Sequence, residues 1–365
     1  MINQLINWQE LSKQQKISAL ARPAIADSAL LSTQVANILS QVKNQGDQAV
    51  FALTEQFDGI ALKTLLVSDA QVASAKLALS DKRLKAIHTA YRQIKAFHSA
   101  QQATDITVET TPGVKCTLKT EAIESVGLYI PAGSAPLPST VLMLGVPAQI
   151  TGCSRTVLVC PPNKEGKLAN EILVAADLCG INEIYTVGGA QAIAALAYGT
   201  ESIKAVNKVF GPGNRYVTEA KTQLSQQVSG FAIDMPAGPS EVLVIADELA
   251  NPAFIAADLL SQAEHGVDSQ VILLTDSEAL ISRVANELET QVNLLSRKAI
   301  AKKALTQSRL ILTKDLTQAV EISNQYGPEH LIIQTENSAS LLNDLRNAGS
   351  IFVGAYTPES AGDYA

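Results

Sequence analysis

The sequence lacks the features of a membrane or secreted protein. No stretch of its 365 residues approaches the ~20 uncharged apolar residues of a membrane span. Its first residues, MINQLINWQELSKQQK, are polar where a signal peptide would be apolar. We therefore expect a cytoplasmic protein.

Charge and cysteine are also scarce. Charged residues make up 17 % of the chain, the net charge is −7, and no cluster of Lys and Arg could neutralise a phosphate backbone, which argues against nucleic acid as a partner. No C-x-x-C pair occurs, so a zinc ribbon or a redox motif is not indicated. We interpret the four cysteines as reduced thiols: Cys116, Cys153, Cys160 and Cys179.

Apolar residues, at 47 %, are plentiful enough to fill the cores of two or more domains. The first hundred residues are predicted to be mainly helical, because apolar residues recur there at helical spacing. One such stripe is Leu31, Val35, Ile38, Leu39 and Val42, and a second is Leu84, Ile87, Tyr91 and Ile94. His88 and His98, on and beyond the second stripe, are interpreted as packing or surface residues.

From about Val126 the pattern changes to short apolar runs, each closed by Gly or Pro and followed by an Ala-rich helical stretch. A second such series begins with EVLVIAD at residue 241 and ends with SIFVG. This alternation predicts two α/β domains, each with a parallel sheet covered by helices on both faces, and a cleft between them.

The domain boundaries are placed by this change of pattern, near residues 127 and 239. We expect an N-terminal arm over 1–25, a first α/β domain over 26–127 plus 240–365, and an inserted α/β domain over 128–239. In this scheme the N-terminal helices pack with the second series of strands.

Several Gly-rich turns follow strands of the first series. They are the loop at 127–140, the turn before Gln191 and the Gly-Pro-Gly turn before Asn214. Helix N-termini at such turns present free N–H groups to anions. None of them is a G-x-G-x-x-G fingerprint, and tight turns alone would also explain the glycines.

A helix is predicted from Asn251 to His265, with Asn251 as N-cap and Gly266 as the C-cap stop. Gln262 and His265 would share a face of its last turn, where the negative end of the helix dipole favours a cation. An amide oxygen and an imidazole nitrogen could both ligate a divalent ion, although a surface histidine gives the same spacing.

Glu329 and His330 follow a Gly-Pro break at the beginning of a strand and are candidates for general acid/base groups. Neighbouring residues of an extended chain point to opposite sides, so both can face one site only if the backbone bends at Pro328. A solvated Glu beside a half-buried His is the other interpretation. Asp363, in the Gly-flanked loop after the last strand, could add an oxygen ligand or simply occupy a turn.

Together these segments resemble histidinol dehydrogenase over essentially the whole chain. The stretches that carry the resemblance are VGLYIPAGSAPLPSTVLML, VFGPGNRYVTEAK, IDMPAGPSEVLVIAD, DLLSQAEHG, GPEHL and AGDYA. It implies two Rossmann-like parallel-sheet domains of the aldehyde dehydrogenase-like kind with a helical N-terminal region. It also implies Zn²⁺ and NAD as cofactors, L-histidinol as substrate and a homodimer as the full-length enzyme.

The resemblance further implies the role of each motif residue. Gln262, His265 and Asp363 would ligate zinc and contact the substrate, Ser240 and His330 would also contact the substrate, and Glu329 and His330 would be catalytic. The NAD site would be lined by Tyr129, Gln191 and Asn214.

A mechanism follows from this picture. Zinc holds the substrate as a template, and His330 removes the alcohol proton as hydride leaves for NAD. Glu329 then activates the water that attacks the aldehyde, and a second NAD takes the next hydride. Family members continue past GDYA into a small C-terminal domain that supplies a zinc-ligating histidine and a substrate-binding glutamate to the partner subunit, and this sequence ends before it.

Three other interpretations remain open at this stage. One is an aldehyde dehydrogenase-like enzyme with Cys153 or Cys116 as a nucleophile. Another is a relative that oxidises a different small polyol or a sulfonated alcohol. The third is an inactive fragment, or a binding or scaffold protein without catalytic activity.

Overall fold

The computed structural model describes residues 5–23, 28–131, 136–236, 238 and 240–364. By its internal contacts the chain divides into two compact units, and we treat each one separately. Unit 1 consists of Met1–Ala26 and Gly238–Gly362, and unit 2 consists of Asp27–Ala237 and Asp363–Ala365. The second division falls close to the predicted boundary at Pro239, a residue outside the described ones, whereas no division occurs near residue 127.

Unit 2 is built on a five-stranded parallel sheet with the order β6-β5-β4-β7-β8. The bounds are β4 (Ser125–Tyr129), β5 (Arg155–Cys160), β6 (Glu183–Thr186), β7 (Lys208–Phe210) and β8 (Ala232–Ile233). The central strands are continuous apolar runs because helices cover both faces of the sheet. In β5, Val157 and Val159 belong to the core on one face, whereas Leu158 and Cys160 belong to the core on the other.

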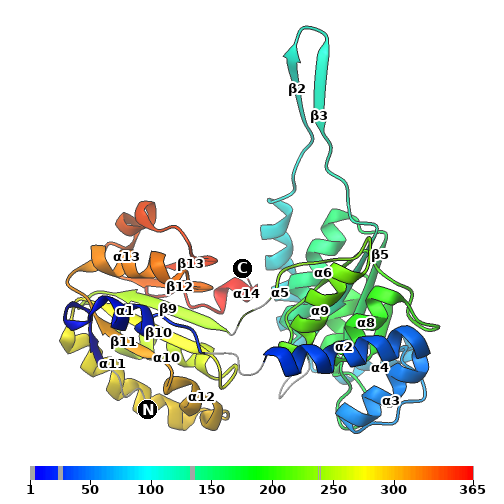
Figure 1. The fold of residues 1–365 in the computed structure, drawn as a ribbon, viewed down its shortest axis with the longest axis horizontal. Coiled ribbons are helices and arrows are strands. Elements are labelled where there is room, and N and C mark those ends of the chain that lie inside the picture. Colours follow the sequence, from blue (N-terminus) through cyan, green and yellow to red (C-terminus); the bar gives the residue numbers. More distant parts are fainter. Residues whose placement is uncertain (1–4, 24–27, 132–135, 237, 239, 365) are drawn as a thin grey trace. The chain divides into compact units, whose positions relative to one another are not determined.

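The helices before residue 100 complete both of these cores (Figure 1). One face carries α2 (Ser28–Gln45), α3 (Asp47–Asp58), α8 (Gly189–Tyr198) and α9 (Arg215–Gln227). The other carries α4 (Asp69–Ala78), α5 (Asp81–Ser99), α6 (Pro138–Thr151) and α7 (Asn170–Leu178). The predicted helicity of this region is confirmed, but the prediction that it packs with the second series of strands is wrong. The apolar stripe of α2 instead packs against the Ala-rich α8.

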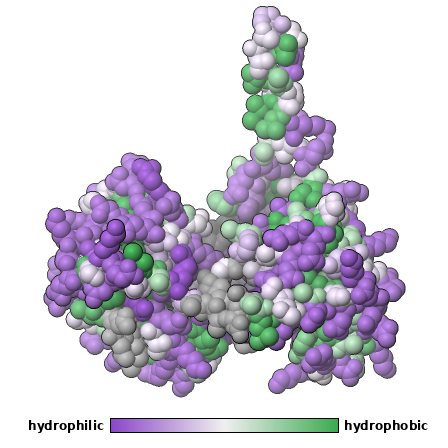
Figure 2. Space-filling model, viewed as in Figure 1, coloured by the Kyte–Doolittle hydropathy of each residue, from purple (hydrophilic) through white to green (hydrophobic). Residues whose placement is uncertain are grey.

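A hairpin between α5 and β4 was not predicted. Its strands, β2 (Ile106–Thr111) and β3 (Val114–Leu118), are antiparallel and extend away from the rest of unit 2 (Figure 1). The large apolar side chains on it are exposed, and Figure 2 shows them as green patches along the projection: Ile106, Val108, Val114 and Leu118. Thr, Glu and Lys alternate with these residues, which makes the stretch appear polar in the sequence.

Unit 1 contains a six-stranded parallel sheet with the order β1-β11-β10-β9-β12-β13. The bounds are β1 (Leu5–Asn7), β9 (Glu241–Ala246), β10 (Gln270–Thr275), β11 (Arg309–Leu312), β12 (His330–Gln334) and β13 (Ser350–Val353). The predicted N-terminal arm thus supplies the edge strand β1. The two predicted parallel sheets are confirmed, whereas the cleft between two domains stays a prediction.

Helices cover both faces of this sheet as well. One face carries α10 (Pro252–Ala263), α11 (Glu278–Gln291) and α12 (Lys298–Leu305), and the other carries α1 (Lys13–Ala19) and α13 (Leu316–Tyr326). The helix expected between β12 and β13 is the 3₁₀ helix η3 (Ser338–Asp344), and the last element is the short α14 (Ala361–Tyr364). Shorter 3₁₀ turns are η1 (Trp8–Glu10) and η2 (Val292–Leu294). Among the described residues, none of the helices is both long and apolar enough to cross a membrane.

Candidate active site

His330 is the first residue of β12, and its ring is held by groups on two neighbouring elements. Nδ1 lies 3.0 Å from the main-chain oxygen of Glu241 in β9 and 2.9 Å from Nε2 of Gln262 in α10. In one tautomer Nδ1 accepts from the Gln262 amide. In the other it donates to the Glu241 carbonyl and leaves Nε2 as a base.

Glu329 lies beside this ring. Its Oε2 accepts a hydrogen bond of 3.3 Å from the main-chain N–H of Glu241 and is 3.8 Å from Nδ1 of His330. The two adjacent residues can face the same side because the strand begins only at His330. The Glu329 side chain is 55 % exposed, so water reaches a carboxylate that borders the imidazole.

Glu359 is a third member of this group, and the sequence analysis missed it. Its Oε1 lies 4.0 Å from Nε2 of His330, and its Oε2 accepts a 3.3 Å hydrogen bond from the Ser261 hydroxyl. The side chain is largely buried. Only the tertiary fold shows the proximity, because the chain after β13 turns back toward the beginning of β12.

The side chain of Gln262 has an oxygen without a partner among the described residues. The residue is 1 % exposed, and its Oε1 makes no hydrogen bond with any described residue, although its Nε2 faces His330 and the Glu241 carbonyl. A buried amide oxygen without a partner is costly, and a cation would satisfy it. This atom therefore fits the metal-ligand role that the resemblance implies.

His265 does not belong to the helix that was predicted to carry it. Helix α10 ends at Ala263 with Glu264 as its C-cap, so the predicted end at Gly266 is wrong. The main-chain N–H of His265 still donates to the Gln262 carbonyl, which keeps the two residues together. The His265 side chain is exposed in this turn.

Ser240 and Asp363 complete the residues predicted for the zinc and substrate site. Ser240 is half-buried immediately before β9. Asp363 lies half-buried on α14 and groups by its contacts with unit 2, so its place beside Gln262 and His265 stays a prediction. Within the described part of the chain, no three His, Cys, Asp or Glu side chains form a metal-binding group.

The candidate site residues of unit 1 lie at the amino edge of its sheet, which is the edge where the strands begin. Ser240 precedes β9, Glu329 and His330 begin β12, and Gln262 is near the C-terminal end of α10. The sequence analysis placed Glu329 and His330 at the beginning of a strand, and the structure has them there. Here the negative end of α10 is the nearest helix terminus, which favours a cation.

The residues predicted to line the NAD site lie at the carboxyl edge of the sheet in unit 2. Tyr129 ends β4, Gln191 is in the first turn of α8, and Asn214 is the N-cap of α9. Strand order reverses between β4 and β7, and ligands of open parallel sheets bind beside such a reversal. The loop at 127–140 also begins here, although Ala132–Ala135 lie outside the described residues.

Each of these three side chains is held in place or buried. The Tyr129 hydroxyl accepts a 3.1 Å hydrogen bond from the Gly189 N–H, and burial raises the pKa of Tyr129 to about 12, so its phenol stays neutral. Gln191 is 1 % exposed, and its Oε1 has no partner among the described residues. The Asn214 side-chain oxygen accepts from the N–H groups of Tyr216 and Val217.

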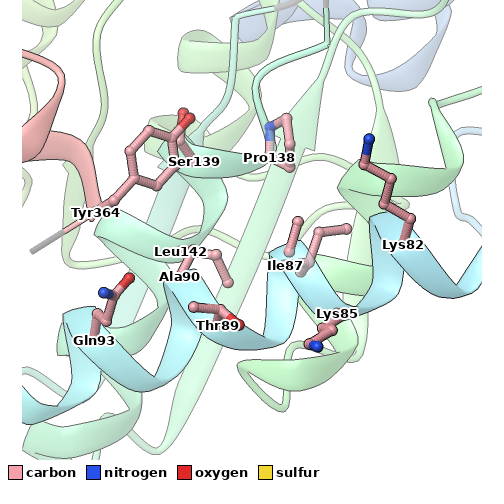
Figure 3. Close-up of a pocket in the computed structure, with 11 residues that line it drawn as sticks. Lys82, Lys85, Ile87, Thr89, Ala90, Gln93, Pro138, Ser139, Leu142 and Tyr364 are labelled. Carbon is pink, nitrogen blue, oxygen red and sulfur yellow. The ribbon is translucent and has the colours of Figure 1, made fainter.

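A pocket of about 550 Å³ lies elsewhere in unit 2, between α5 and α6 (Figure 3). It contains none of the predicted site residues. Its lining combines apolar residues such as Ile87 and Leu142 with polar ones such as Lys82 and Ser139. The pocket is of ligand size, and Pro138 and Ser139 in its lining belong to the loop at 127–140.

The surroundings of the four cysteines give no support to a role as a nucleophile. Burial raises the pKa of Cys160 and that of Cys179 to about 12, which keeps both as neutral thiols. Cys116 is exposed on β3, and Cys153 is half-buried in the turn between α6 and β5. All four are free, as predicted.

Comparison with known proteins gives one consistent result. A family model described as histidinol dehydrogenase matches residues 21–365. The histidinol dehydrogenase of Colwellia psychrerythraea is 86 % identical over 365 residues, which are 100 % of this chain and 84 % of that protein. The Yersinia pestis enzyme of the same name is 56 % identical over 100 % of this chain and 81 % of its own length. The crystal structure of histidinol dehydrogenase from Elizabethkingia anophelis has a TM-score of 0.94 at 46 % identity, with 99 % of this chain and 82 % of that chain covered.

Proposed function

The chain belongs to the histidinol dehydrogenase family of NAD-dependent oxidoreductases, and on this premise we propose that it oxidises L-histidinol to L-histidine through L-histidinaldehyde. Two NAD molecules would be reduced for each histidinol. The observation that carries the proposal is the arrangement of His330, Glu329 and Gln262 around the Glu241 main chain. It brings a base, a carboxylate and an unsatisfied amide oxygen to one edge of one sheet.

His330 is the proton carrier in this proposal. When Nδ1 and the Gln262 amide both donate to the Glu241 carbonyl, Nε2 has a free lone pair and can accept the substrate's hydroxyl proton as hydride leaves the carbon that bears this hydroxyl. The carboxylate of Glu359 lies 4.0 Å from this Nε2. The hydrogen bond to the Glu241 carbonyl holds the imidazole ring of His330 in one orientation during proton transfer.

Glu329 acts in the second oxidation. Its carboxylate is exposed enough to hold a water molecule, and it can take a proton from that water as the oxygen attacks the aldehyde carbon. The 3.3 Å hydrogen bond from the Glu241 N–H orients the carboxylate. The His330 imidazolium returns its proton to the aldehyde oxygen, which completes the hydrate and frees the ring to accept a proton again when the hydrate gives its hydride to the second NAD.

Gln262, His265 and Asp363 would hold zinc. The buried and unsatisfied Oε1 of Gln262 supports this assignment, and amide, imidazole and carboxylate donors form a mixed N/O set that suits zinc. When bound, zinc would supply a fixed template for the substrate nitrogens, and NAD would accept the hydride. Ser240 would contact the substrate beside this set.

Tyr129, Gln191 and Asn214 would line the NAD site. Their position at the strand reversal of unit 2 supports this, because the N-termini of α8 and α9 carry the positive ends of the helix dipoles, which favour the anionic pyrophosphate. A homodimer and a cytoplasmic location also remain proposals. Light scattering would test the first of these.

The direct test is the stoichiometry of the reaction. Purified protein with zinc and excess NAD should form two NADH per L-histidinol and release L-histidine. Other small polyols and sulfonated alcohols serve as controls. One NADH per substrate, or faster turnover of a control alcohol, would contradict the proposal and favour a different member of the superfamily of alcohol-oxidising relatives.

A further inference from the structure

Unit 2 contains an ion pair between a buried lysine and a partly exposed aspartate, which the proposed reaction does not use. Lys221, on α9, is 3 % exposed, and its Nζ donates 2.6 Å hydrogen bonds to Oδ1 of Asp234 and to the main-chain oxygen of Gly211. Asp234 follows β8, and its Oδ2 accepts a 2.8 Å hydrogen bond from the Gly211 N–H. One ion pair thus holds both main-chain polar groups of a single glycine.

Gly211 is the residue through which this ion pair acts on the edge of the sheet. Its φ is +125°, a conformation that L side chains rarely adopt. A Cβ at this position would lie 2.1 Å from the main-chain oxygen of Tyr129, so the turn after β7 is pressed directly against the end of β4. No residue other than glycine permits this approach.

The same turn leads directly to the N-cap of α9. Asn214 follows Gly211 after Pro212 and Gly213, and a Cβ on Gly213 would meet the Val217 side chain at 2.4 Å. The turn is therefore closely packed at both Gly211 and Gly213. The Gly211–Asn214 turn connects two of the three residues proposed for the NAD site, Tyr129 and Asn214.

If Lys221 only filled space in the core, an uncharged side chain would serve. Burying an ammonium group is costly, and an apolar side chain of similar volume commonly stabilises a core at least as well as an ion pair does. A paired lysine gives what an apolar residue cannot, namely hydrogen bonds of fixed direction to a carbonyl and a carboxylate. Both of these bonds bear on the position of Gly211.

We propose that Lys221 and Asp234 are positioning residues for NAD, which set the Gly211–Asn214 turn against β4 so that Tyr129 and Asn214 are held for the cofactor. This inference rests on the proposed NAD site of unit 2. It assigns no catalytic step to either residue. The expected consequence of breaking the ion pair is weaker binding of NAD rather than slower chemistry.

The test compares Lys221→Met and Asp234→Asn with the wild type by calorimetric titration of NAD and by steady-state kinetics. Both variants should raise the Kd and the KM for NAD at least tenfold, which corresponds to about 1.4 kcal/mol. The KM for histidinol and kcat at saturating NAD should change by less than about twofold, since a positioning defect that NAD binding overcomes affects binding more than chemistry.

A matched control is the ion pair between Arg155 and Glu183, which is bidentate with two bonds of 2.8 Å and lies at the opposite, amino edge of the same sheet. Glu183→Gln removes one charge from it and should leave the affinity for NAD unchanged. If Glu183→Gln weakens NAD binding as much as Asp234→Asn does, general destabilisation is the cause and the proposal is overturned.

Two further results are decisive. If Lys221→Met does not fold, Asp234→Asn alone decides, because an asparagine oxygen can still accept from the Gly211 N–H. Unchanged NAD affinity in a folded Asp234→Asn variant would overturn the positioning role while leaving the proposed function intact. A wild-type protein that does not bind NAD would instead overturn the proposed function itself.

Discussion

The two units share an architecture but differ in where their polar groups gather. In both, a parallel sheet is covered by helices on each face. The candidate groups of unit 1 lie at the amino edge of its sheet, near the C-terminal end of α10. Those of unit 2 lie at the carboxyl edge, where α8 and α9 begin.

This difference matches the charge of the proposed ligands. The C-terminal end of a helix carries partial negative charge and suits a cation, whereas an N-terminus suits a phosphate. Each edge also contains a glutamine that is 1 % exposed and whose Oε1 has no partner among the described residues, Gln262 in unit 1 and Gln191 in unit 2. The same layered fold can therefore offer opposite edges to a metal ion and to a dinucleotide.

Replacing the proposed base should have the largest effect. His330→Asn should lower kcat for histidinol oxidation by about 10³-fold, because general acid–base catalysis contributes 10²–10⁴-fold. NAD affinity should stay unchanged, since the substitution lies in unit 1. Measurement of NADH formation checks the first point and calorimetry the second. A variant that keeps a tenth of wild-type kcat would disprove the role of His330.

The neighbouring carboxylate should separate the two oxidations. Glu329→Gln should slow oxidation of the aldehyde by about 10²-fold while slowing alcohol oxidation only slightly, because only the second step needs an activated water. Histidinaldehyde and histidinol, supplied separately to the same variant, allow the comparison. If the variant slows the oxidation of both substrates equally, Glu329 does not act specifically in the second oxidation.

Gln262 and Gln191, one at each edge, allow the most balanced test of the comparison. Gln262→Leu should weaken zinc binding by about 10–100-fold without changing NAD affinity, and Gln191→Leu should weaken NAD binding by about tenfold without changing zinc content. Each variant is the control for the other. If either substitution reduces both affinities, the assignment of one ligand to each edge is wrong.

The last prediction concerns the pH dependence of stability rather than catalysis or binding. Burial raises the pKa of Asp258 to about 7, and the charge of Glu359 adds to this, although a hydrogen bond from Gln334 opposes it. The folded state therefore disfavours the ionised form. The associated stability is fully present below about pH 4 and is lost as the pH rises through about 7.

Asp258→Asn should remove this dependence. The loss in the wild type is at most about 4 kcal/mol, since one pKa unit corresponds to about 1.4 kcal/mol. The variant's Tm should change less between pH 5 and pH 8 than that of the wild type, and substitution of the exposed Asp81 should leave the wild-type profile unaltered. Identical profiles for Asp258→Asn and the wild type would contradict the assignment.

Much of the fold could be predicted because its signals are local. The stripe from Leu31 to Val42 predicted α2, and runs such as EVLVIAD predicted buried strands because both faces of the sheet are covered. The exposed hairpin was missed although its sequence alternates apolar and polar residues on both sides of a Pro-Gly turn, which is a strand signal. The packing of the N-terminal helices depends on long-range contacts that no periodicity contains.

The candidate site was predictable only in part, for the same reason. Gln262 and His330 were each identified by their motif, but their 2.9 Å approach joins elements 68 residues apart. Glu359 was missed because it follows β13, whose end lies at the other edge of the sheet. Asp234 belonged to a recognised stretch, IDMPAGPSE, yet its bond to Lys221 is visible only in the fold.

The central claim is that the amino edge of unit 1 holds the metal. The most direct test is an anomalous difference map, recorded at the zinc absorption edge, from crystals of the protein grown with zinc. Our account predicts a peak about 2.0–2.2 Å from Oε1 of Gln262 and from a ring nitrogen of His265. A fully occupied zinc peak elsewhere, with Oε1 of Gln262 still without a partner, would contradict it.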